Sequence, residues 1–335
     1  MMELIDFSKN KDSISKQMDI ESILLYGNPD NILDAEITIC IPTYKRPNLL
    51  RDAIESAVNQ NTNIGYQIIV VDNDSDFNNT EVAEIVQSFN DSKIIYYKNK
   101  ENLQLFGNLN RCAVLARTKY FAFLHDDDLL LEDYLEHVAT IITKVKKKIK
   151  CLLISCTDNI YLSSLDKESK NIKFYIKKVY ARVKSIKKLV KIPFSANIFY
   201  ELGTPTCGIL FERNAFIESG GFNADYFPSA DGAFFLYFSR NYNTYKYKKI
   251  LSIYRFMVNE SERPETKEKI RLLREFFIQS IKEINVLYRV IISIFQADIN
   301  SVIMKRFYNR DCRKSLLYKI TFRVYDIYLG TINKM

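Results

Sequence analysis

Strand-like and helix-like segments alternate along the first half of this chain, and this alternation restricts its fold more than any other feature. Four short apolar runs are separated by stretches whose apolar residues recur at helical spacing. The runs are Glu36–Ile41, Gln67–Val71, Lys93–Tyr97 and Tyr120–Leu124, and helices are expected near residues 49–58, 79–89, 106–117 and 131–148. Strands joined through such helices form right-handed crossovers, so the pattern predicts a mainly parallel sheet flanked by helices.

Three consecutive aspartates, Asp126–Asp128, directly follow the fourth apolar run, and His125 precedes them. Clustered carboxylates are a poor end for a core strand, but they suit a divalent cation at the carboxyl edge of an α/β sheet, where such folds bind ligands. Mg²⁺ and Mn²⁺ prefer oxygen ligands and commonly use one or two carboxylates together with substrate phosphates. The other interpretation is an acidic turn that caps the helix beginning near Leu131. The motif alone leaves both interpretations open.

The positive charge of the chain is concentrated near its end. The net charge is +8, from 48 basic and 40 acidic residues, and residues 299–335 hold eight Lys or Arg against two acids. The rest of the chain is nearly balanced, so we expect no nucleic-acid partner. The six cysteines form no CxxC pair, which favours buried free thiols in a reducing compartment over a zinc site.

The sequence contains neither an apolar signal segment at its start nor a run long enough to span a bilayer. The longest apolar run, Val290–Phe295, is far too short. We therefore expect a cytoplasmic protein, and contact with the inner face of the plasma membrane as a peripheral protein is compatible with this.

After Lys150 the alternation loosens. Short strands are predicted at Cys151–Cys156, Thr206–Phe211 and Ile250–Phe256, and helices at Asp231–Ser239 and from Pro264 onward. Residues 163–192 are rich in Lys and Ser and are expected to form a solvated excursion. These patterns divide the chain into an N-terminal extension (1–35), a main domain (36–258) and a C-terminal helical region (259–335).

Motifs at the predicted strand ends resemble those of the family 2 glycosyltransferases, which have the GT-A fold. Ile41–Arg46 (IPTYKR) is similar to an IPTYNR-like strand end, Val70–Ser75 (VVDNDS) to a VVDDGS-like turn, and His125–Asp128 to a D-x-D motif. Asn102–Ala116 resembles the N-x-G…N…A segment of the family. The match covers residues 36–130 well and 200–256 more loosely, and the order of the motifs makes it specific.

The resemblance implies an α/β fold of the GT-A type, with a mixed, mainly parallel sheet flanked by helices and a C-terminal helical extension. Residues 36–130 would be the nucleotide-sugar half and residues 150–258 the acceptor half. The implied reaction is an inverting transfer of a sugar from a nucleotide-diphosphate donor, with a UDP-sugar favoured. The implied acceptor is a glycan or a lipid-linked saccharide in bacterial surface polysaccharide synthesis.

The resemblance also implies which residues bind the donor. They are Pro42, Thr43, Tyr44, Arg46, Asp72, Asn108 and Asp126. Chemically, Tyr44 can stack on a base, the Asp72 carboxylate can accept a hydrogen bond from a pyrimidine N–H, and Arg46 can reach a phosphate.

A divalent cation, Mn²⁺ or Mg²⁺, is the implied cofactor, because it would neutralise the charge that develops on the leaving diphosphate. Asp127 aligns with the metal-binding aspartate of the family motif, and Asp128 is the second expected metal ligand. His125 stands where the family has an aspartate. This departure leaves open whether Asp126 binds the ribose or the metal, and His125 is as well explained as a hydrogen-bonded structural residue.

An inverting transfer needs one carboxylate that takes the proton of the acceptor hydroxyl. Phe227–Gly232 resembles the second acidic motif of the family, with Ala230 in place of its first acid, so Asp231 is the candidate catalytic base. The alternative is that Asp231 caps the helix that follows. Gly203–Thr206 resembles the loop near the acceptor, and Tyr254–Arg255 resembles a late pair that closes the site.

Other functions are less well supported by the sequence. A sugar nucleotidyltransferase or a dinucleotide oxidoreductase would need a glycine-rich phosphate loop, and Pro42–Pro47 contains no glycine. A hydrolase triad is disfavoured because His125 and His137 are the only histidines. A non-catalytic partner protein that kept the fold would explain Ala230, but it would not explain why Asp72, Asp127 and Asp231 are retained. The basic, aromatic C-terminal helices suit either an anionic membrane surface or packing on the catalytic domain.

Overall fold

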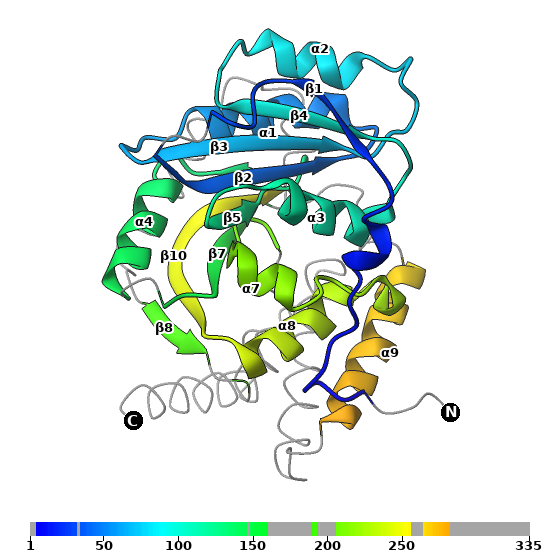
Figure 1. The fold of residues 1–335 in the computed structure, drawn as a ribbon. Helices are drawn as coiled ribbons and strands as arrows, with labels where there is room; N and C mark the ends of the chain where they lie inside the picture. The colour runs from blue at the N-terminus through cyan, green and yellow to red at the C-terminus, as the bar shows by residue number, and fades with distance from the viewer. Residues whose placement is uncertain are drawn as a thin grey trace.

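The computed structural model describes residues 5–31, 34–145, 148–159, 189–192, 194, 206–255 and 264–281. These residues form a ten-stranded sheet with the strand order β1-β4-β3-β2-β5-β9-β7-β10-β6, and β8 pairs beside β10. Helices cover both faces of the sheet (Figure 1). The predicted α/β architecture, a mixed and mainly parallel sheet flanked by helices, is confirmed.

The first half of the chain supplies the parallel part of the sheet. Its strands and helices are β2 (Ala35–Thr43), α1 (Pro47–Val58), β3 (Gly65–Asp72), α2 (Glu81–Ser88), β4 (Ile94–Asn99), α3 (Gln104–Leu115) and β5 (Tyr120–Phe123). Strand β2 pairs in parallel with β3 and β5, and β3 pairs in parallel with β4. All four predicted strands and their intervening helices are therefore confirmed.

The core has two layers because side chains alternate across the sheet. In β2, Ile39 and Ile41 belong to the cluster that includes α1, whereas Cys40 belongs to the cluster that includes α3. The second cluster is rich in phenylalanine, and Phe121, Phe211 and Phe216 pack with ring centroids 5.1–5.7 Å apart. These apolar layers hold the strands in register, which fixes where each strand ends.

The second half of the chain makes the sheet mixed. Its elements are β6 (Leu129–Leu130), α4 (Tyr134–Lys144), β7 (Cys151–Asn159), β8 (Leu189–Ile192), β9 (Leu210–Glu212), α7 (Arg213–Glu218), a 3₁₀ turn (Ala224–Tyr226), α8 (Ala230–Asn241), β10 (Thr244–Arg255) and α9 (Pro264–Ser280). Strand β9 lies antiparallel between β5 and β7, and β10 returns parallel to β7. Strand β10 also pairs with β6, so it ends beside the segment that follows β5.

Two segments differ from the sequence predictions. The strand expected from Thr206 begins only at Leu210, because residues 206–209 turn at Gly208, which has φ +75° and accepts a hydrogen bond from the Tyr134 hydroxyl through its carbonyl. The segment expected to be a solvated excursion contributes β8, which pairs antiparallel with β10. Short pairings of this kind depend on the partner strand and leave little signal in the local sequence.

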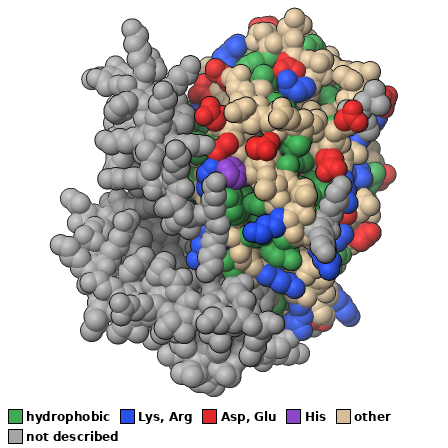
Figure 2. Space-filling view, turned by 90° about the vertical axis from the view of Figure 1, so that its left-hand side faces the viewer, with side chains coloured by type: hydrophobic (Ala, Val, Ile, Leu, Met, Phe, Trp, Pro, Cys, Tyr) green, Lys and Arg blue, Asp and Glu red, His purple; other side chains and the backbone are tan. Residues whose placement is uncertain are grey.

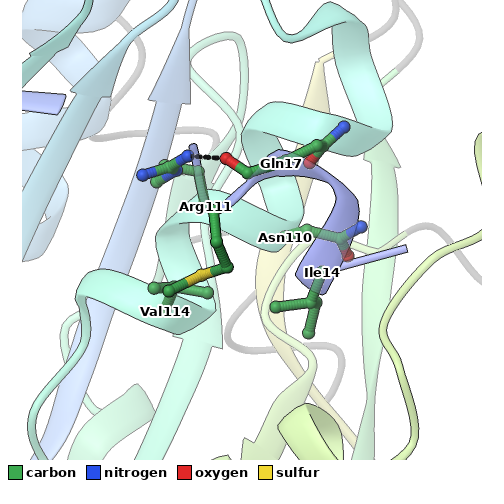
Figure 3. A pocket seen from close by; sticks show the side chains of 6 residues that line it. Ile14, Gln17, Asn110, Arg111 and Val114 are labelled. Carbon is green, nitrogen blue, oxygen red and sulfur yellow. Dashed lines mark hydrogen bonds between the residues drawn. The ribbon is translucent and has the colours of Figure 1, made fainter. Parts of the chain in front are cut away.

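The segment predicted as an N-terminal extension contributes to the sheet and to its packing. Strand β1 (Ser22–Tyr26) pairs antiparallel with β4 at one edge of the sheet. Before it, a 3₁₀ turn (Ser15–Gln17) docks on α3, where the Arg111 guanidinium donates to the carbonyl oxygens of Gln17 and Ile20 (Figure 3). Residues 5–26 therefore form part of the folded unit.

Several sequence predictions fall on residues outside the described ranges. They are the end of the main domain at 258, most of the 163–192 segment, the acceptor-side loop up to Pro205, and the basic helices after residue 281. In the described part of the chain, no helix is both long and apolar enough to cross a membrane. On the face shown in Figure 2, acidic and basic side chains are interspersed among the other described side chains.

Candidate active site

Three neighbouring parallel strands have polar side chains at their C-terminal ends. Together these strand ends form the carboxyl edge of the sheet. In the parallel register, Thr43 of β2 is the partner of Asp72 of β3, and Asp72 is the partner of Lys98 of β4. Each of these residues is buried. The carboxyl edge of an open α/β sheet is where such folds bind their ligands, so this row is the starting point of the candidate site.

Asp72 accepts two hydrogen bonds and lies beside one ammonium group. Its Oδ1 accepts from the backbone N–H of Asp74 at 2.9 Å, and its Oδ2 accepts from the Tyr96 hydroxyl at 3.0 Å and lies 3.6 Å from Lys98 Nζ. Burial raises the pKa of the Asp72 carboxyl, while the N–H of Asp74, Lys98 and Tyr96 act in the opposite direction. The result is a carboxylate acceptor directly beside an ammonium donor.

Behind this row, asparagine side chains form a buried network. Asn73 Oδ1 accepts from the side-chain amide of Asn99 at 3.0 Å and from the backbone N–H of Leu103 at 2.9 Å. Asn108 Oδ1 accepts from the same Asn99 amide at 2.9 Å, and Asn108 Nδ2 donates to the carbonyl of Val71 at 3.1 Å. Both polar ends of Asn108 are thus engaged within the protein. Its predicted contact with the donor remains a prediction, and these bonds favour a positioning role for it.

We expect Asn108→Ala to lower the free energy of unfolding by about 2 kcal/mol, because the amide of Asn99 and the carbonyl of Val71 would each lose a partner in a buried site. Urea denaturation measures this loss. The matched control is Asn241→Ala, since Asn241 is exposed and donates only to a carbonyl of its own helix, and its effect should stay within about 0.5 kcal/mol. Equal losses of unfolding free energy in Asn108→Ala and Asn241→Ala would contradict a stabilising role of the asparagine network.

The acidic triplet Asp126–Asp128 lies against the loop between β2 and α1. The Thr43 hydroxyl donates to Asp126 Oδ2 at 2.8 Å, and Arg46 Nη1 donates to Asp127 Oδ2 at 2.8 Å. Arg46 Nη1 also lies 3.7 Å from Asp126 Oδ1. The structure therefore joins two motifs that are about 80 residues apart in sequence.

Asp126 lies in a buried site beside the charge of Asp127. Burial, and next the charge of Asp127, raise the pKa of Asp126 to about 6, although the Thr43 hydrogen bond and Arg46 lower it. Among the described residues, no group of three or more His, Cys, Asp or Glu side chains is arranged to hold a metal ion by itself. Asp126 and Asp127 therefore fit a divalent cation that takes its other ligands from a diphosphate, and do not fit a cage made of protein ligands alone.

Asp128 differs from its neighbours because it is fully buried. Its Oδ1 accepts from the backbone N–H of Arg255 at 2.9 Å, whereas its Oδ2 has no nitrogen or oxygen partner in the described structure. Burial, and next the charge of Asp127, raise the pKa of this carboxyl well above its usual value, and the nearby Cys207 thiol lowers it. The predicted metal contact of Asp128 remains a prediction, and this environment favours a structural role.

The other predicted donor residues lie around the same edge. Pro42 is buried in β2, and Tyr44 is 44% exposed immediately after that strand. The Lys45 ammonium lies 5.4 Å from the centre of the Tyr44 ring. His125 Nε2 is hydrogen-bonded to the Thr206 hydroxyl, so this histidine connects the acidic triplet to the segment before β9.

Asp231 lies in the first turn of α8 and is half-buried. Its Oδ1 accepts from the backbone N–H of Gly232 at 2.9 Å. The segment before α8 contacts the start of α3, where the rings of Phe227 and Phe106 are 6.4 Å apart, and α3 is itself tied to Asn73 through the N–H of Leu103. These contacts place the start of α8 near the carboxyl edge of the sheet, through α3 and Asn73.

Lys98 was not among the residues predicted from sequence, and the contacts of Arg255 could not be predicted. Lys98 carries a signal that could have been used, because Ile94, Tyr96 and Lys98 alternate on one face of β4 and a buried lysine there needs an acidic partner. Arg255 was expected to close the site, but its guanidinium is buried against the backbone of the acidic triplet. That contact joins residues 129 apart in sequence and has no local signal.

Comparison with known proteins finds similarity to one family. Residues 38–199 match the sequence model of glycosyl transferase family 2. An uncharacterized glycosyltransferase of Methanocaldococcus jannaschii is 36% identical over 103 residues, which are 30% of this chain and 34% of the relative. The abequosyltransferase of Salmonella typhimurium is 30% identical over 126 residues, covering 35% of this chain and 38% of that protein. The matched parts thus span only about a third of these relatives.

Solved structures support the fold. The crystal structure of S. aureus TarS 1-349 in complex with UDP superposes with a TM-score of 0.52 at 14% identity, covering 84% of this chain and 73% of that one. The complex of the same protein with UDP-GlcNAc gives a TM-score of 0.54 at 12% identity, covering 87% and 79%. At this level of identity the likeness shows a shared fold, the GT-A glycosyltransferase fold.

Proposed function

Because this chain carries a domain of glycosyl transferase family 2 on a GT-A fold, we propose that it transfers a sugar from a nucleotide-diphosphate donor to a saccharide acceptor. In this proposal the transfer depends on a divalent metal and inverts the anomeric centre. The donor is a UDP-sugar, and the acceptor is a glycan or lipid-linked saccharide of a bacterial surface polysaccharide. The observation that carries the proposal is the meeting of Asp72, Asp126 and Asp127 at one sheet edge.

We propose that the base of the nucleotide binds at the pair of Asp72 and Lys98. A carboxylate acceptor beside an ammonium donor, 3.6 Å apart, is complementary to an N–H beside a carbonyl oxygen. Uracil, thymine and guanine present that edge, and cytosine presents an amino donor beside a ring-nitrogen acceptor, so the pair suits a base without selecting one. Uridine is favoured because TarS, a protein of the same fold, is bound to UDP and UDP-GlcNAc in its structures. Asp72 and Lys98 are both buried, and the Phe77 ring lies over the Lys98 ammonium. The turn that carries Phe77 must therefore move when the base binds.

The diphosphate would lie over the acidic triplet. Arg46 is 40% exposed at its side chain and already pairs with Asp127, so it can turn toward a phosphate oxygen. Asp126 and Asp127 would hold Mn²⁺ or Mg²⁺, which when bound supplies the positive charge that stabilises the leaving diphosphate. The acceptor oxygen then forms its bond to the anomeric carbon as the bond to the diphosphate breaks, and Asp231 takes the hydroxyl proton.

Calorimetric titration with UDP, dTDP, GDP and CDP, in Mn²⁺ and then in EDTA, tests the donor side of this function. We expect metal-dependent binding of UDP, in which the buried Asp72 carboxylate accepts a hydrogen bond from the base N–H. Asp72→Asn should weaken the binding of UDP by at least about tenfold, since a neutral amide oxygen is a weaker acceptor than a carboxylate. The control Asp76→Asn changes an exposed acid of the following turn and should preserve the binding of UDP.

Two outcomes would contradict the proposal. If none of the four nucleotides binds in the presence of Mn²⁺, a non-catalytic protein that kept the fold becomes the better description. If Asp72→Asn binds UDP as tightly as the wild type, the assignment of Asp72 and Lys98 to the base is wrong.

A further inference from the structure

A single arginine at the end of β10, Arg255, forms hydrogen bonds with the acidic triplet. Arg255 Nε donates to the carbonyl oxygen of Asp127, and Arg255 Nη2 donates to the carbonyl oxygen of Asp126 at 3.2 Å. The backbone N–H of Arg255 donates to Asp128 Oδ1 at 2.9 Å. One residue therefore makes a hydrogen bond to each member of the triplet.

The same guanidinium also holds α1. Arg255 Nη2 donates to the carbonyl oxygen of Leu49 at 3.0 Å, and Arg255 Nη1 donates to Asp52 Oδ2 at 2.7 Å. Helix α1 begins directly after Arg46, which is the partner of Asp127 on the open side of the triplet. Arg255 thus binds both segments that form the ion pair between Arg46 and Asp127.

This contact pattern needs an arginine. Three guanidinium nitrogens donate in different directions within one plane, and the side chain is only 3% exposed. A lysine ammonium of similar length is a point charge without the planar fork and could not reach all four acceptors. The delocalised positive charge also lies under three consecutive aspartates, where it offsets their mutual repulsion.

We propose that Arg255 is a positioning residue. By binding the backbone of the triplet, it sets the geometry in which Asp126 and Asp127 bind the cation and the diphosphate. This inference rests on the proposed function. It differs from the expectation that Arg255 closes the site, because the guanidinium contacts the backbone of the triplet and of α1. Arg255 thus leaves the carboxylates of Asp126 and Asp127 to Thr43, to Arg46 and to the ligand.

The test compares Arg255→Lys with Arg213→Lys. Arg213 is the matched control because its guanidinium likewise donates to two backbone carbonyls, those of Ala113 and Val114, but it lies on α7 away from the triplet. In Arg255→Lys we expect the affinity for Mn²⁺ in the presence of UDP to fall about 10- to 100-fold, as is usual when a residue that orients metal ligands is replaced. Arg213→Lys should bind Mn²⁺ and UDP like the wild type.

Hydrogen exchange of the metal-free proteins gives a second readout that does not depend on activity. The amides of residues 124–130 should exchange faster in Arg255→Lys and at the wild-type rate in Arg213→Lys. If Arg255→Lys does not fold, Asp52→Ala tests the same arrangement, because it removes only the partner of Arg255 Nη1 and the Asp52 side chain is 45% exposed. It should weaken Mn²⁺ binding in the same direction, by a smaller factor.

The outcomes separate this inference from the proposed function. Wild-type protein that binds no nucleotide with Mn²⁺ would overturn the proposed function itself. Wild-type binding that persists unchanged in folded Arg255→Lys, or in Asp52→Ala if the lysine variant does not fold, would overturn only the role of Arg255. Equal losses in Arg255→Lys and Arg213→Lys would also overturn it, since the effect would then be one of general stability.

Discussion

Replacing Asp127 by asparagine is expected to lower the rate of sugar transfer by about 10³-fold, because the variant loses the carboxylate that pairs with Arg46 and that we propose to bind the cation. Asparagine keeps the size of the side chain and one oxygen, so the fold should persist. The measurement is the initial rate of transfer in Mn²⁺, together with calorimetric binding of UDP in Mn²⁺ and in EDTA. Metal-dependent binding should disappear in the variant.

Asp128→Asn is the matched comparison for this experiment. Asp128 is fully buried, accepts from the N–H of Arg255 through Oδ1, and has a carboxyl whose pKa burial raises well above its usual value. An amide of the same shape should therefore be tolerated, and Mn²⁺-dependent UDP binding should remain close to that of the wild type. A loss as large as that of Asp127→Asn would instead restore Asp128 as a metal ligand.

Asp231→Asn should reduce transfer by about 10²- to 10⁴-fold while leaving Mn²⁺-dependent UDP binding intact, because a general base acts on the acceptor and not on the nucleotide. Asp231 lies in the first turn of α8, and the contact between Phe227 and Phe106 brings this turn to the side of the strand ends. Transfer to the acceptor and donor binding must be measured on the same preparation, so that the two effects can be separated.

The control for Asp231 is Asp225→Asn. Asp225 precedes α8 in the same loop and forms a surface ion pair with Lys11, so its loss should change neither transfer nor nucleotide binding appreciably. Undiminished transfer in Asp231→Asn would remove the base assignment, and the carboxylate would then serve only at the start of the helix.

The parallel part of the fold could be predicted from sequence because its signals are local. Apolar runs such as Gln67–Val71 and the helical spacing after Pro47 each report on their own element, and the crossover rule orders them. Strands β6, β8 and β9 have only two, four and three residues. Such short strands are stabilised by their partners, so the sequence around them carries little information about them.

The candidate site could be predicted from sequence only for the residues that lie at the ends of the predicted strands. Thr43, Asp72 and Asp126–Asp128 end or follow buried strands, and parallel strand ends meet at one edge, so their proximity follows from the fold. Lys98 and Arg255 act through partners on other strands. Their roles depend on the register of β3 with β4 and on the return of β10, and neither can be derived from the residues adjacent to them in sequence.

The position of Arg255 in the chain has a consequence for the order in which the protein becomes functional. Asp128 and Arg255 are 127 residues apart, and a nascent chain leaves the ribosome from its N-terminus. Strands β2 to β5 can therefore assemble long before β10 has been synthesised, with the carbonyls of the acidic loop still bound to water. The loop receives its arginine only after β10 has been synthesised. We expect chains that end before β10 to hold the acidic loop less firmly than the whole chain does.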